Sequence, residues 1–211
     1  MQKKDKRRFG LIGSGISHSL SPKLFLEAHG EDCAYDLLDF DDFEEAWAAF
    51  AEGPYEAVNV TAPFKVSAAQ RCEVRSPEAE QCGAANIVVK SGNIFHAYNS
   101  DVLGVRKIVS ALKGVRSVTV IGGGGAGRAA LCACRSLGLE PALLHHDDEL
   151  EVKSDLIIYT LPRRVECNLD CAHILEANYK DPCFTGHPGY ISGLEWLRAQ
   201  AEEGYGIMYY R

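Results

Sequence analysis

Residues 118–130 read VTVIGGGGAGRAA, and this stretch decides the class of fold. An apolar run typical of a buried strand leads directly into glycines and then into a helical segment. The spacing Gly122-x-Gly124-x-x-Gly127 matches the dinucleotide-binding fingerprint. Because the glycines stand between an expected strand and an expected helix, a dinucleotide site is favoured over a purely structural tight turn.

The fingerprint assigns a physical task to each of its glycines. Gly122 makes the sharp turn, Gly124 lets the backbone approach a pyrophosphate, and Gly127 lets helix and strand pack. The helix that follows offers free amide donors and a partial positive charge at its N-terminus. We therefore expect Gly122, Gly124, Gly125, Ala126 and Gly127 to bind a cofactor.

An acidic residue about 20 positions further on normally accepts a ribose hydroxyl. Here residues 145–149 read HHDDE, without an arginine, and we expect Asp147 to take this role. Asp147 and Asp148 would repel a 2′-phosphate, which favours NAD over NADP.

The rest of the chain alternates apolar runs with helical patterns, and this order predicts an α/β fold. We expect strands at residues 9–13, 34–38, 57–60, 87–89, 94–97, 118–121, 142–144, 155–161 and 174–178. We expect helices that begin near residues 21, 42, 101, 125 and 194. Phe43, Trp47 and Phe50 share one helix face, and we interpret them as core residues. A chain of 211 residues is long enough for two lobes.

The composition narrows the range of partners. A formal net charge of −7 and a pI near 5.5 argue against a nucleic-acid partner. Basic residues gather at the N-terminus, where we expect a solvated, frayed end; they are Lys3, Lys4, Lys6, Arg7 and Arg8. No apolar stretch approaches the roughly 20 residues of a membrane helix, and no apolar signal region follows the basic start. We therefore expect a cytoplasmic protein without a membrane partner.

The eight cysteines lack the regular spacing of a disulfide scaffold, so we expect reduced and mostly buried thiols. Cys167, Cys171 and His173 have no second Cys-x-x-Cys pair to complete a tetrahedral set, and we expect no metal site. Cys132 and Cys134 lie two apart on an expected helix, and we interpret them as packing residues.

Three polar segments lie at expected strand-to-helix junctions: HSLSP at 18–22, NVTAPFK at 59–65 and NSDVLG at 99–104. Hydroxyls, amides and one lysine in loops on a rigid scaffold suit a polyol or carboxylate ligand. Taken singly, Ser21 and Asp101 are better explained as helix caps, and Lys65 as a surface lysine.

Taken together, these segments resemble the signature blocks of the shikimate dehydrogenase family, in the same order. The matching blocks are Ser-x-Ser-Pro, Asn-Val-Thr-x-Pro-x-Lys, Asn-x-Asp and the glycine loop. Residues 193–201 (GLEWLRAQA) resemble the family's Gly-Leu-x-Met-Leu-x-x-Gln helix, with Trp196 in place of the methionine. Several ordered blocks across the chain are more specific than a glycine motif alone.

The resemblance implies a nicotinamide-dependent oxidoreductase that acts on a CH–OH group, reversibly reducing 3-dehydroshikimate to shikimate in aromatic amino acid biosynthesis. It implies that Lys65 handles the proton, with Asp101 as its partner. It implies substrate contacts from Ser19, Ser21, Thr61, Asn86, Asp101 and Gln200. It also implies NADP as the cofactor and a small-molecule substrate as the partner, and we expect a monomer or a homodimer.

The resemblance further implies two lobes. Residues 1–101 with 190–211 would form an N-terminal α/β substrate-binding lobe, and residues 102–189 a reduced Rossmann-like dinucleotide-binding lobe. The family's Asn-Arg-Thr block for the 2′-phosphate is absent, and residues 147–155 leave hardly any room for a crossover helix. Two alternatives therefore stay open: an NAD-preferring quinate/shikimate dehydrogenase, and a shikimate-binding protein with impaired cofactor binding.

Overall fold

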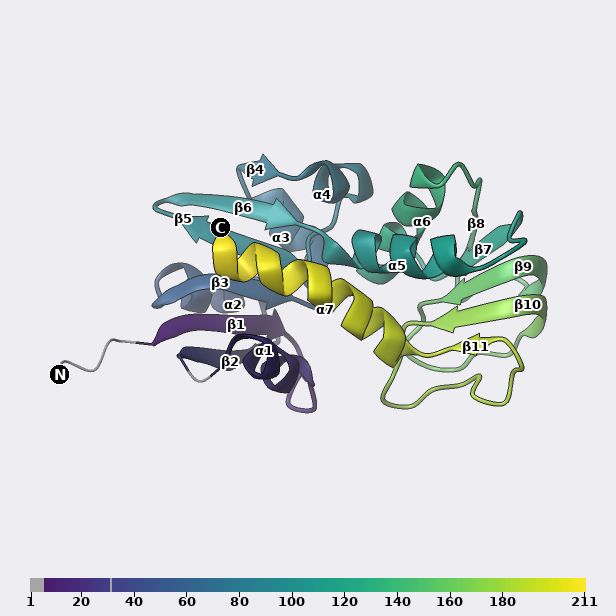
Figure 1. Ribbon diagram of the computed structural model, residues 1–211, viewed down its shortest axis with the longest axis horizontal. Coiled ribbons are helices and arrows are strands. Elements are labelled where there is room, and N and C mark those ends of the chain that lie inside the picture. Colours follow the sequence, from purple (N-terminus) through teal and green to yellow (C-terminus); the bar gives the residue numbers. More distant parts are fainter. Residues whose placement is uncertain (1–5, 31) are drawn as a thin grey trace. The chain divides into compact units, whose positions relative to one another are not determined.

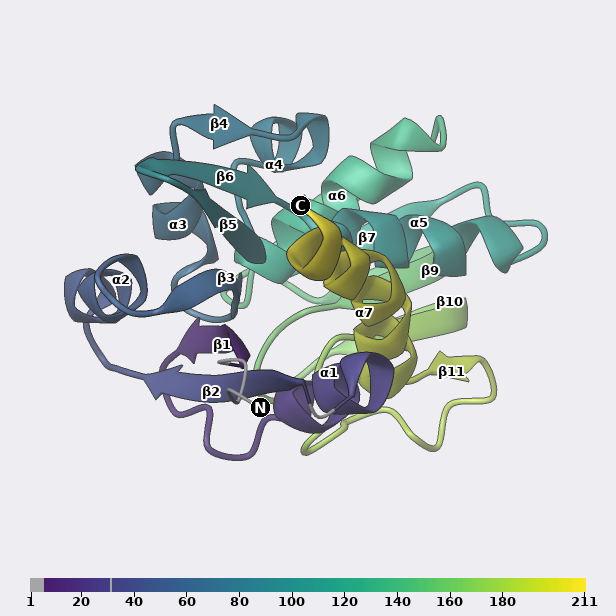
Figure 2. The same ribbon diagram turned by 60° about the vertical axis from the view of Figure 1, so that its left-hand side comes forward.

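The computed structural model describes residues 6–30 and 32–211, which form two α/β units, each built around its own β-sheet. The first unit comprises Met1–Ser100 and Ala201–Arg211, and the second comprises Asp101–Gln200. Figure 1 labels the elements, and Figure 2 shows them from another side. The predicted fold class, α/β with two lobes, is confirmed. Within the described residues, no helix is both long and apolar enough to cross a membrane.

The first unit contains a six-stranded sheet of order β2-β1-β3-β5-β6-β4. Its strands are β1 (Arg7–Gly13), β2 (Cys33–Asp39), β3 (Tyr55–Val60), β4 (Val74–Arg75), β5 (Ile87–Ser91) and β6 (Ile94–Tyr98). Its helices are α1 (Ser21–His29), α2 (Phe43–Ala51), α3 (Lys65–Arg71), α4 (Pro77–Cys82) and the last turns of α7 (Gly193–Tyr210). β1 runs parallel to β2 and β3, whereas β5 is antiparallel to β3 and β6. The sheet is therefore mixed.

Side chains of the central strands alternate between two cores, one on each face of this sheet. Phe9 and Leu11 of β1 enter one core, which also contains Phe25 of α1 and Tyr205 of α7. Ile12 enters the other core, together with residues of α2 and α3. Both faces of the first sheet are therefore covered by helices.

The aromatic residues of α2 belong to the second of these cores. The ring centroid of Trp47 lies 5.7 Å from those of Phe43 and Phe50, and 4.9 Å from that of Phe95 on β6. Asp42 starts the helix by accepting hydrogen bonds from two backbone N–H groups of its first turn. The interpretation of this aromatic stripe as core is confirmed.

The second unit contains a five-stranded parallel sheet of order β11-β10-β9-β7-β8. Its strands are β7 (Val118–Ile121), β8 (Ala142–Leu144), β9 (Glu151–Tyr159), β10 (Asn168–Glu176) and β11 (Tyr190–Ile191), and its helices are α5 (Ser100–Ala111) and α6 (Gly125–Ser136). After β7 the chain first adds β8 on one side of that strand and then crosses over to add β9 on its other side. A doubly wound sheet binds its ligands at such a switch point.

The later strands of this sheet are connected without helices, which the short spacing at residues 147–155 predicts only for the connection before β9. A parallel connection usually takes a dozen or more residues, yet residues 160–167 join the end of β9 to the start of β10. To return along a nine-residue strand, this segment must be nearly extended. The Tyr159 hydroxyl donates to the Arg163 carbonyl at 2.8 Å and accepts the Val165 N–H at 3.1 Å. One buried tyrosine thus fixes the middle of the return segment.

The boundary of the second unit falls later in the chain than the expected division at residue 190. β11 pairs with β10 through Ile174 and Leu175, so the chain stays in the second sheet until the last helix begins. Only Ala201–Arg211 join the first unit. Helix α7 therefore contributes to both units, which an amphipathic pattern alone does not reveal.

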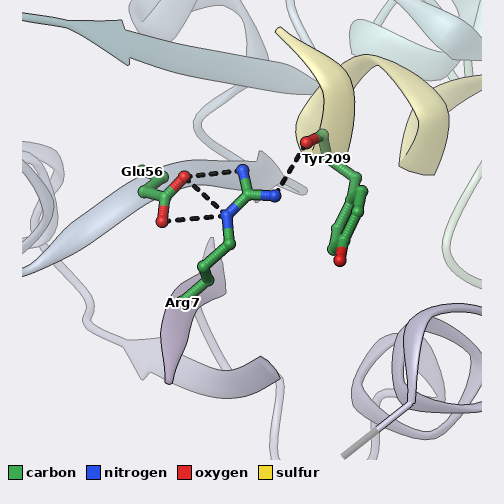
Figure 3. Close-up of polar contacts among 3 residues, drawn as sticks. All are labelled: Arg7, Glu56 and Tyr209. Carbon is green, nitrogen blue, oxygen red and sulfur yellow. Dashed lines mark hydrogen bonds and ion pairs between the residues drawn. The ribbon is translucent and has the colours of Figure 1, made fainter. Parts of the chain in front are cut away.

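The N-terminal basic segment is not a frayed end at Arg7 and Arg8, which belong to β1; this expectation was wrong. Lys3 and Lys4 lie outside the described residues. Arg7 donates to both carboxylate oxygens of Glu56 on β3, at 2.6–3.0 Å, and to the carbonyl oxygen of Tyr209 on α7 at 2.9 Å (Figure 3). Its guanidinium carbon also lies 4.5 Å from the Tyr209 ring centroid. Arg7 therefore ties the end of the C-terminal helix to the sheet.

We predict that Arg7→Ala lowers the free energy of unfolding by about 1–3 kcal/mol, because it removes charged hydrogen bonds and a ring contact together. Arg8→Ala is the matched control, since Arg8 makes only a 3.6 Å ion pair with Asp36 that is partly exposed; it should lower this free energy by less than about 1 kcal/mol. Urea unfolding measures both changes. Equal losses in the two variants would show that the contact with Tyr209 adds nothing.

Candidate functional site

The topology of the first sheet brings its polar segments to one edge. β1 and β3 are parallel, so the segments that follow them, including Ser19, Ser21, Thr61 and Lys65, leave from the same edge. β5 is antiparallel to β3 and therefore begins at that edge, directly after Asn86. The predicted substrate residues of the first unit are thus gathered at the carboxyl ends of two neighbouring parallel strands.

A chain of buried hydrogen bonds orders this edge. The Tyr35 hydroxyl donates to Asn59 Oδ1 at 2.7 Å, and Asn59 Nδ2 donates to the Asn86 carbonyl at 3.3 Å. Asn86 in turn accepts the Ser100 N–H at its Oδ1, at 2.8 Å, and donates from its Nδ2 to Ser100 Oγ at 3.0 Å. Burial raises the pKa of Tyr35 well above its usual value, so this hydroxyl remains a donor. Tyr35 was missed from the sequence because a strand tyrosine carries no local motif.

The two serines of the first loop are held close together. Ser21 is the first residue of α1, and Leu20 occupies the cap position without a side-chain hydrogen bond, so the cap interpretation of Ser21 was wrong. Ser19 Oγ accepts the Ser21 N–H at 3.2 Å, which leaves the Ser19 hydroxyl proton free to donate elsewhere. The Ser21 carbonyl accepts the Tyr205 hydroxyl at 3.3 Å. These bonds hold the backbone at Ser21 in place and keep Ser19 close to it.

Thr61 and Lys65 flank a short turn after β3. The Thr61 N–H donates to the Ile12 carbonyl at 2.9 Å, and the Thr61 carbonyl accepts the Phe64 N–H at 3.0 Å. The peptide bond between Ala62 and Pro63 is cis. Lys65 opens α3 and is half-buried, so it lies at the edge of the sheet and not on an open surface.

Asp101 and Gln200 belong to the second unit, and each is 7% exposed. Asp101 lies in the first turn of α5, three residues before Gly104. A Cβ at Gly104 would lie 2.8 Å from the backbone nitrogen of Gln200, so α5 and α7 approach closely at this point. The Gln200 carboxamide nitrogen lies 3.2 Å from the Leu197 carbonyl, to which it donates. The buried side chains of Asp101 and Gln200 are therefore both close to the contact between α5 and α7.

The glycine loop has the expected strand–turn–helix geometry. Gly122 has a φ of +107°, which side-chain-bearing residues rarely adopt, and a Cβ at Gly127 would collide with the Gly122 carbonyl oxygen. Gly124 precedes α6, and the space that its Cβ would occupy is open. Gly125 and Ala126 form the first turn of α6, where amide groups have no intrahelical acceptor. The loop therefore offers free backbone N–H donors, and no protein atom blocks access to its backbone at Gly124.

Thr160, at the end of β9, also holds this loop and was not singled out from the sequence. Its hydroxyl lies 2.9 Å from the Ile121 carbonyl oxygen and 3.2 Å from the Gly122 carbonyl oxygen, to which it donates. The position of Thr160 at the carboxyl end of an apolar strand is a weak signal. It becomes informative only once β9 is known to lie beside β7.

The two aspartates of the acidic loop after β8, Asp147 and Asp148, make different contacts. Asp148 accepts the His145 N–H at 2.6 Å, and its own N–H donates to the His145 carbonyl, so its carboxylate closes a turn. Asp147 is exposed, with one carboxylate oxygen 3.9 Å from His146 Nδ1. Asp147 is therefore the aspartate whose carboxylate is not used to close the turn.

The cysteines show no metal geometry in the part of the chain that the structure describes, where no three His, Cys, Asp or Glu residues are placed to share an ion. Cys171 Sγ lies 3.7 Å from His187 Nε2 instead. His187 Nδ1 accepts the Gly189 N–H at 3.1 Å, which fixes the orientation of the ring. Cys132 and Cys134 are buried on α6.

These features define a class of protein: a two-unit α/β protein with a polar sheet edge in one unit and a dinucleotide-type glycine loop in the other. Residues 11–88 match the family model described as the shikimate dehydrogenase substrate binding domain. The first unit therefore resembles the substrate binding domain of shikimate dehydrogenases.

Curated relatives carry the same family name. The shikimate dehydrogenase (NADP(+)) of Halobacterium salinarum is 39% identical over 140 residues, which cover 62% of this chain and 52% of the relative. That of Xylella fastidiosa is 29% identical over 199 residues, covering 90% of this chain and 61% of the relative. The chain thus spans about half to three fifths of the length of these relatives.

Solved structures share the fold. Shikimate 5-dehydrogenase from Thermus thermophilus, in complex with NADP(H) and shikimate, has a TM-score of 0.84 at 23% identity, covering 97% of this chain and 94% of that chain. Shikimate dehydrogenase from Aquifex aeolicus has a TM-score of 0.83 at 21% identity, covering 100% and 95%. The two-unit fold of this chain is therefore that of known shikimate dehydrogenases.

We predict that Gly124→Ala folds normally but binds a nicotinamide dinucleotide at least about tenfold more weakly. A Cβ at this position meets no protein atom, and the φ of −70° suits alanine, so only a ligand that approaches the backbone would be obstructed. Gly127→Ala is the contrasting variant, since its Cβ would collide within the protein and should lower stability by about 1–3 kcal/mol. Thermal unfolding and titration with the reduced cofactor, followed by fluorescence, separate the two effects. Unchanged binding by Gly124→Ala would argue against a dinucleotide on this loop.

Proposed function

We propose that this protein is a shikimate dehydrogenase, which catalyses the reversible, nicotinamide-dependent reduction of 3-dehydroshikimate to shikimate. The observation that carries this proposal is the joint presence of two sites in one chain. The first unit presents hydroxyl, amide and ammonium groups at one sheet edge, and the second unit presents a glycine loop at the switch point of a doubly wound sheet. The relatives' names and the complex of the Thermus structure with NADP(H) and shikimate support it.

In this proposal the substrate is bound mainly by neutral donors, most of which belong to the first unit. Ser19 and Ser21 hold the carboxylate, and Ser19 Oγ, which accepts the Ser21 N–H, still has its own proton to donate. Thr61, Asn86 and Gln200 bind ring hydroxyls. The orientation of the Asn86 carboxamide is fixed by Ser100, which reduces the entropy lost on binding.

Lys65 is the proposed acid–base residue, with Asp101 as its partner. When the ketone is reduced, charge develops on its oxygen, and a nearby ammonium stabilises that oxygen and supplies the proton. Asp101 is 7% exposed, so its carboxylate favours a neighbouring cation more strongly than an exposed carboxylate would. A nicotinamide dinucleotide, when bound, would supply or take the hydride, and the loop residues Gly122, Gly124, Gly125, Ala126 and Gly127 would hold its pyrophosphate.

The cofactor is proposed to be NADP or NAD, and two features favour different answers. The relatives are named as NADP(+) enzymes. Residues 145–149 of this chain contain no arginine, and the exposed Asp147 would oppose a 2′-phosphate. We propose that Asp147 shifts this chain toward NAD, as in an NAD-preferring quinate/shikimate dehydrogenase.

A second candidate function rests on the missing crossover helices of the second unit. A protein that keeps the substrate edge and binds the cofactor poorly would act as a shikimate-binding protein. Mixing the purified protein with shikimate, or quinate, and NAD or NADP distinguishes the two functions by the absorbance of the reduced nicotinamide. Turnover supports the dehydrogenase; its absence, with calorimetric binding of shikimate, supports the binding protein.

We predict that Lys65→Ala lowers kcat by about 10²–10⁴-fold, while the Kd for shikimate changes by less than about tenfold. The loss falls on kcat because the proton is needed only as the reaction proceeds. Lys153→Ala is the control, since Lys153 is exposed and paired with Asp170 on the second sheet. Steady-state kinetics and calorimetry measure the two constants. Retained kcat in Lys65→Ala would remove the acid–base role from this lysine.

We predict that Asp147→Ala increases kcat/KM with NADP relative to NAD by about threefold to tenfold, because it removes a charge beside the adenosine ribose. Asp148→Ala should change both cofactors alike, because its carboxylate closes the turn at His145. The ratio of kcat/KM for the two cofactors is the measured quantity. A ratio that moves equally in both variants would show that Asp147 does not face the ribose.

A further inference from the structure

The loop of residues 14–20 joins β1 to α1 and carries Ser19, one of the two proposed carboxylate-binding serines. These residues belong to no strand or helix, so contacts with other segments have to fix their course. Gly15 has a φ of +66°, a left-handed conformation that few residues other than glycine adopt. Successive backbone N–H groups in such turns form a concave site for an anion.

Asp39, the last residue of β2, places its carboxylate in this site. The Gly15 N–H donates to Asp39 Oδ1 at 2.7 Å, and the Ile16 N–H donates to Asp39 Oδ2 at 3.0 Å. Hydrogen bonds to an ionised acceptor are stronger than those between neutral groups. The next residue, Phe40, donates its N–H to the Gly13 carbonyl at 3.0 Å. The end of β2 is therefore attached both to the end of β1 and to the loop that follows it.

The backbone of Ile16 connects Asp39 with Ser19. The side chain of Ile16 is buried, and its carbonyl accepts the Ser19 N–H at 2.8 Å. Ser19 Oγ in turn accepts the Ser21 N–H at 3.2 Å. An unbroken series of hydrogen bonds thus runs from the Asp39 carboxylate through Ile16 and Ser19 to Ser21.

The start of the same loop contacts the turn that carries Thr61. The Ser14 N–H donates to the Ala62 carbonyl at 3.3 Å, and a Cβ at Gly13 would collide with Thr61 Cγ2. The two segments are therefore packed against each other at the edge of the sheet. A change in the course of the loop would also disturb the surroundings of Thr61.

We propose that Asp39 is a positioning residue for substrate binding, which holds the loop in the shape that presents the hydroxyls of Ser19 and Ser21 to the carboxylate of the polyol acid. This inference rests on the proposed function. Asp39 acts through the backbone of Gly15 and Ile16 and needs no contact with the substrate. Its two carboxylate oxygens are directed at two N–H groups, so the loop keeps one shape before the ligand arrives, which lowers the cost of binding.

The first test compares affinity with turnover. Asp39→Ala should raise the Kd and the KM for shikimate about fivefold to twentyfold and leave kcat within about twofold, because the proton and hydride steps do not use this loop. The Kd for NADP⁺ should stay unchanged, since the glycine loop belongs to the second unit. Asp39→Asn retains one acceptor oxygen and should restore part of the affinity for shikimate.

Asp41→Ala is the matched control. Asp41 lies two residues after Asp39 and accepts the Ser14 hydroxyl at 2.7 Å, so its removal changes a side-chain contact of the same loop. It should leave the Kd for shikimate within about twofold of that of the unmodified protein. Calorimetry measures the dissociation constants, and steady-state kinetics measures KM and kcat.

Amide hydrogen exchange provides a second test that needs no ligand. The N–H groups of Gly15 and Ile16 should exchange faster in Asp39→Ala than in Asp41→Ala, while the amides of β1 should exchange alike in both variants. Equal exchange at Gly15 and Ile16 in the two variants would contradict the positioning role.

Two further outcomes separate this inference from the proposed function. If Asp39→Ala binds shikimate as well as Asp41→Ala does, or if Asp39→Asn binds it more tightly than the unmodified protein, the inference is overturned and the proposed function stands. If the unmodified protein neither binds shikimate nor oxidises it, the proposed function fails and this inference fails with it.

Discussion

The buried hydrogen bonds from Tyr35 through Asn59 and Asn86 to Ser100 are the interaction on which the arrangement of the first unit depends. They tie β2, β3 and the residue before β5 to the first residue of α5, where the chain leaves the first sheet. Each member is satisfied by the next, so the network fixes one geometry at little net cost, whereas removal of a single member would leave a buried group unpaired. Because Asn86 is used in this way, it is a structural residue first, and any role toward a substrate depends on the same orientation.

In the second unit, a face of the sheet is covered without crossover helices. The return segment 160–167 and the loop 177–189 take the place of those helices, and both are anchored by buried polar side chains. Tyr159 holds the first segment. Glu176 is fully buried and accepts the backbone N–H groups of Cys183 and Phe184. Burial and the nearby Glu176 raise the pKa of Tyr190 to about 12. Irregular chain can cover a sheet only when its backbone groups find such partners.

The sequence predicted those parts of the fold that depend on local pattern. The glycine stretch, most of the strands and the aromatic stripe around Trp47 follow from short-range periodicity and turn chemistry, and the structure confirms them. β9 and β10 begin earlier than expected, and the short strands β4 and β11 were not expected. The errors concern long-range partners. Arg7 looked like a solvated charge because its acceptors, Glu56 and Tyr209, lie 49 and 202 residues away. The loss of crossover helices could be inferred from spacing, but the tyrosine that pins the return segment could not, because its role depends on the parallel pairing of β9 and β10.

The crossover helices that the second unit lacks would cover a face of its sheet. The proposed chemistry takes place at the carboxyl ends of the strands instead. In the described part of this unit, β7, α6 and β8 retain a complete strand–helix–strand crossover, and this crossover carries the glycine loop. The hydroxyl of Thr160, which directly follows the neighbouring strand β9, donates to the Ile121 carbonyl at the start of the glycine loop. The loop is therefore also held from the β9 side. An acidic chain of net charge −7 that binds a pyrophosphate gains little from its overall field, and the helix N-terminus must supply the attraction locally. The shortened unit therefore has to preserve the geometry of the glycine loop. A helix packed on β10 or β11 would only cover the sheet. This separation of cover from binding explains how a sheet can lack crossover helices and keep the glycine loop that the proposed cofactor would need.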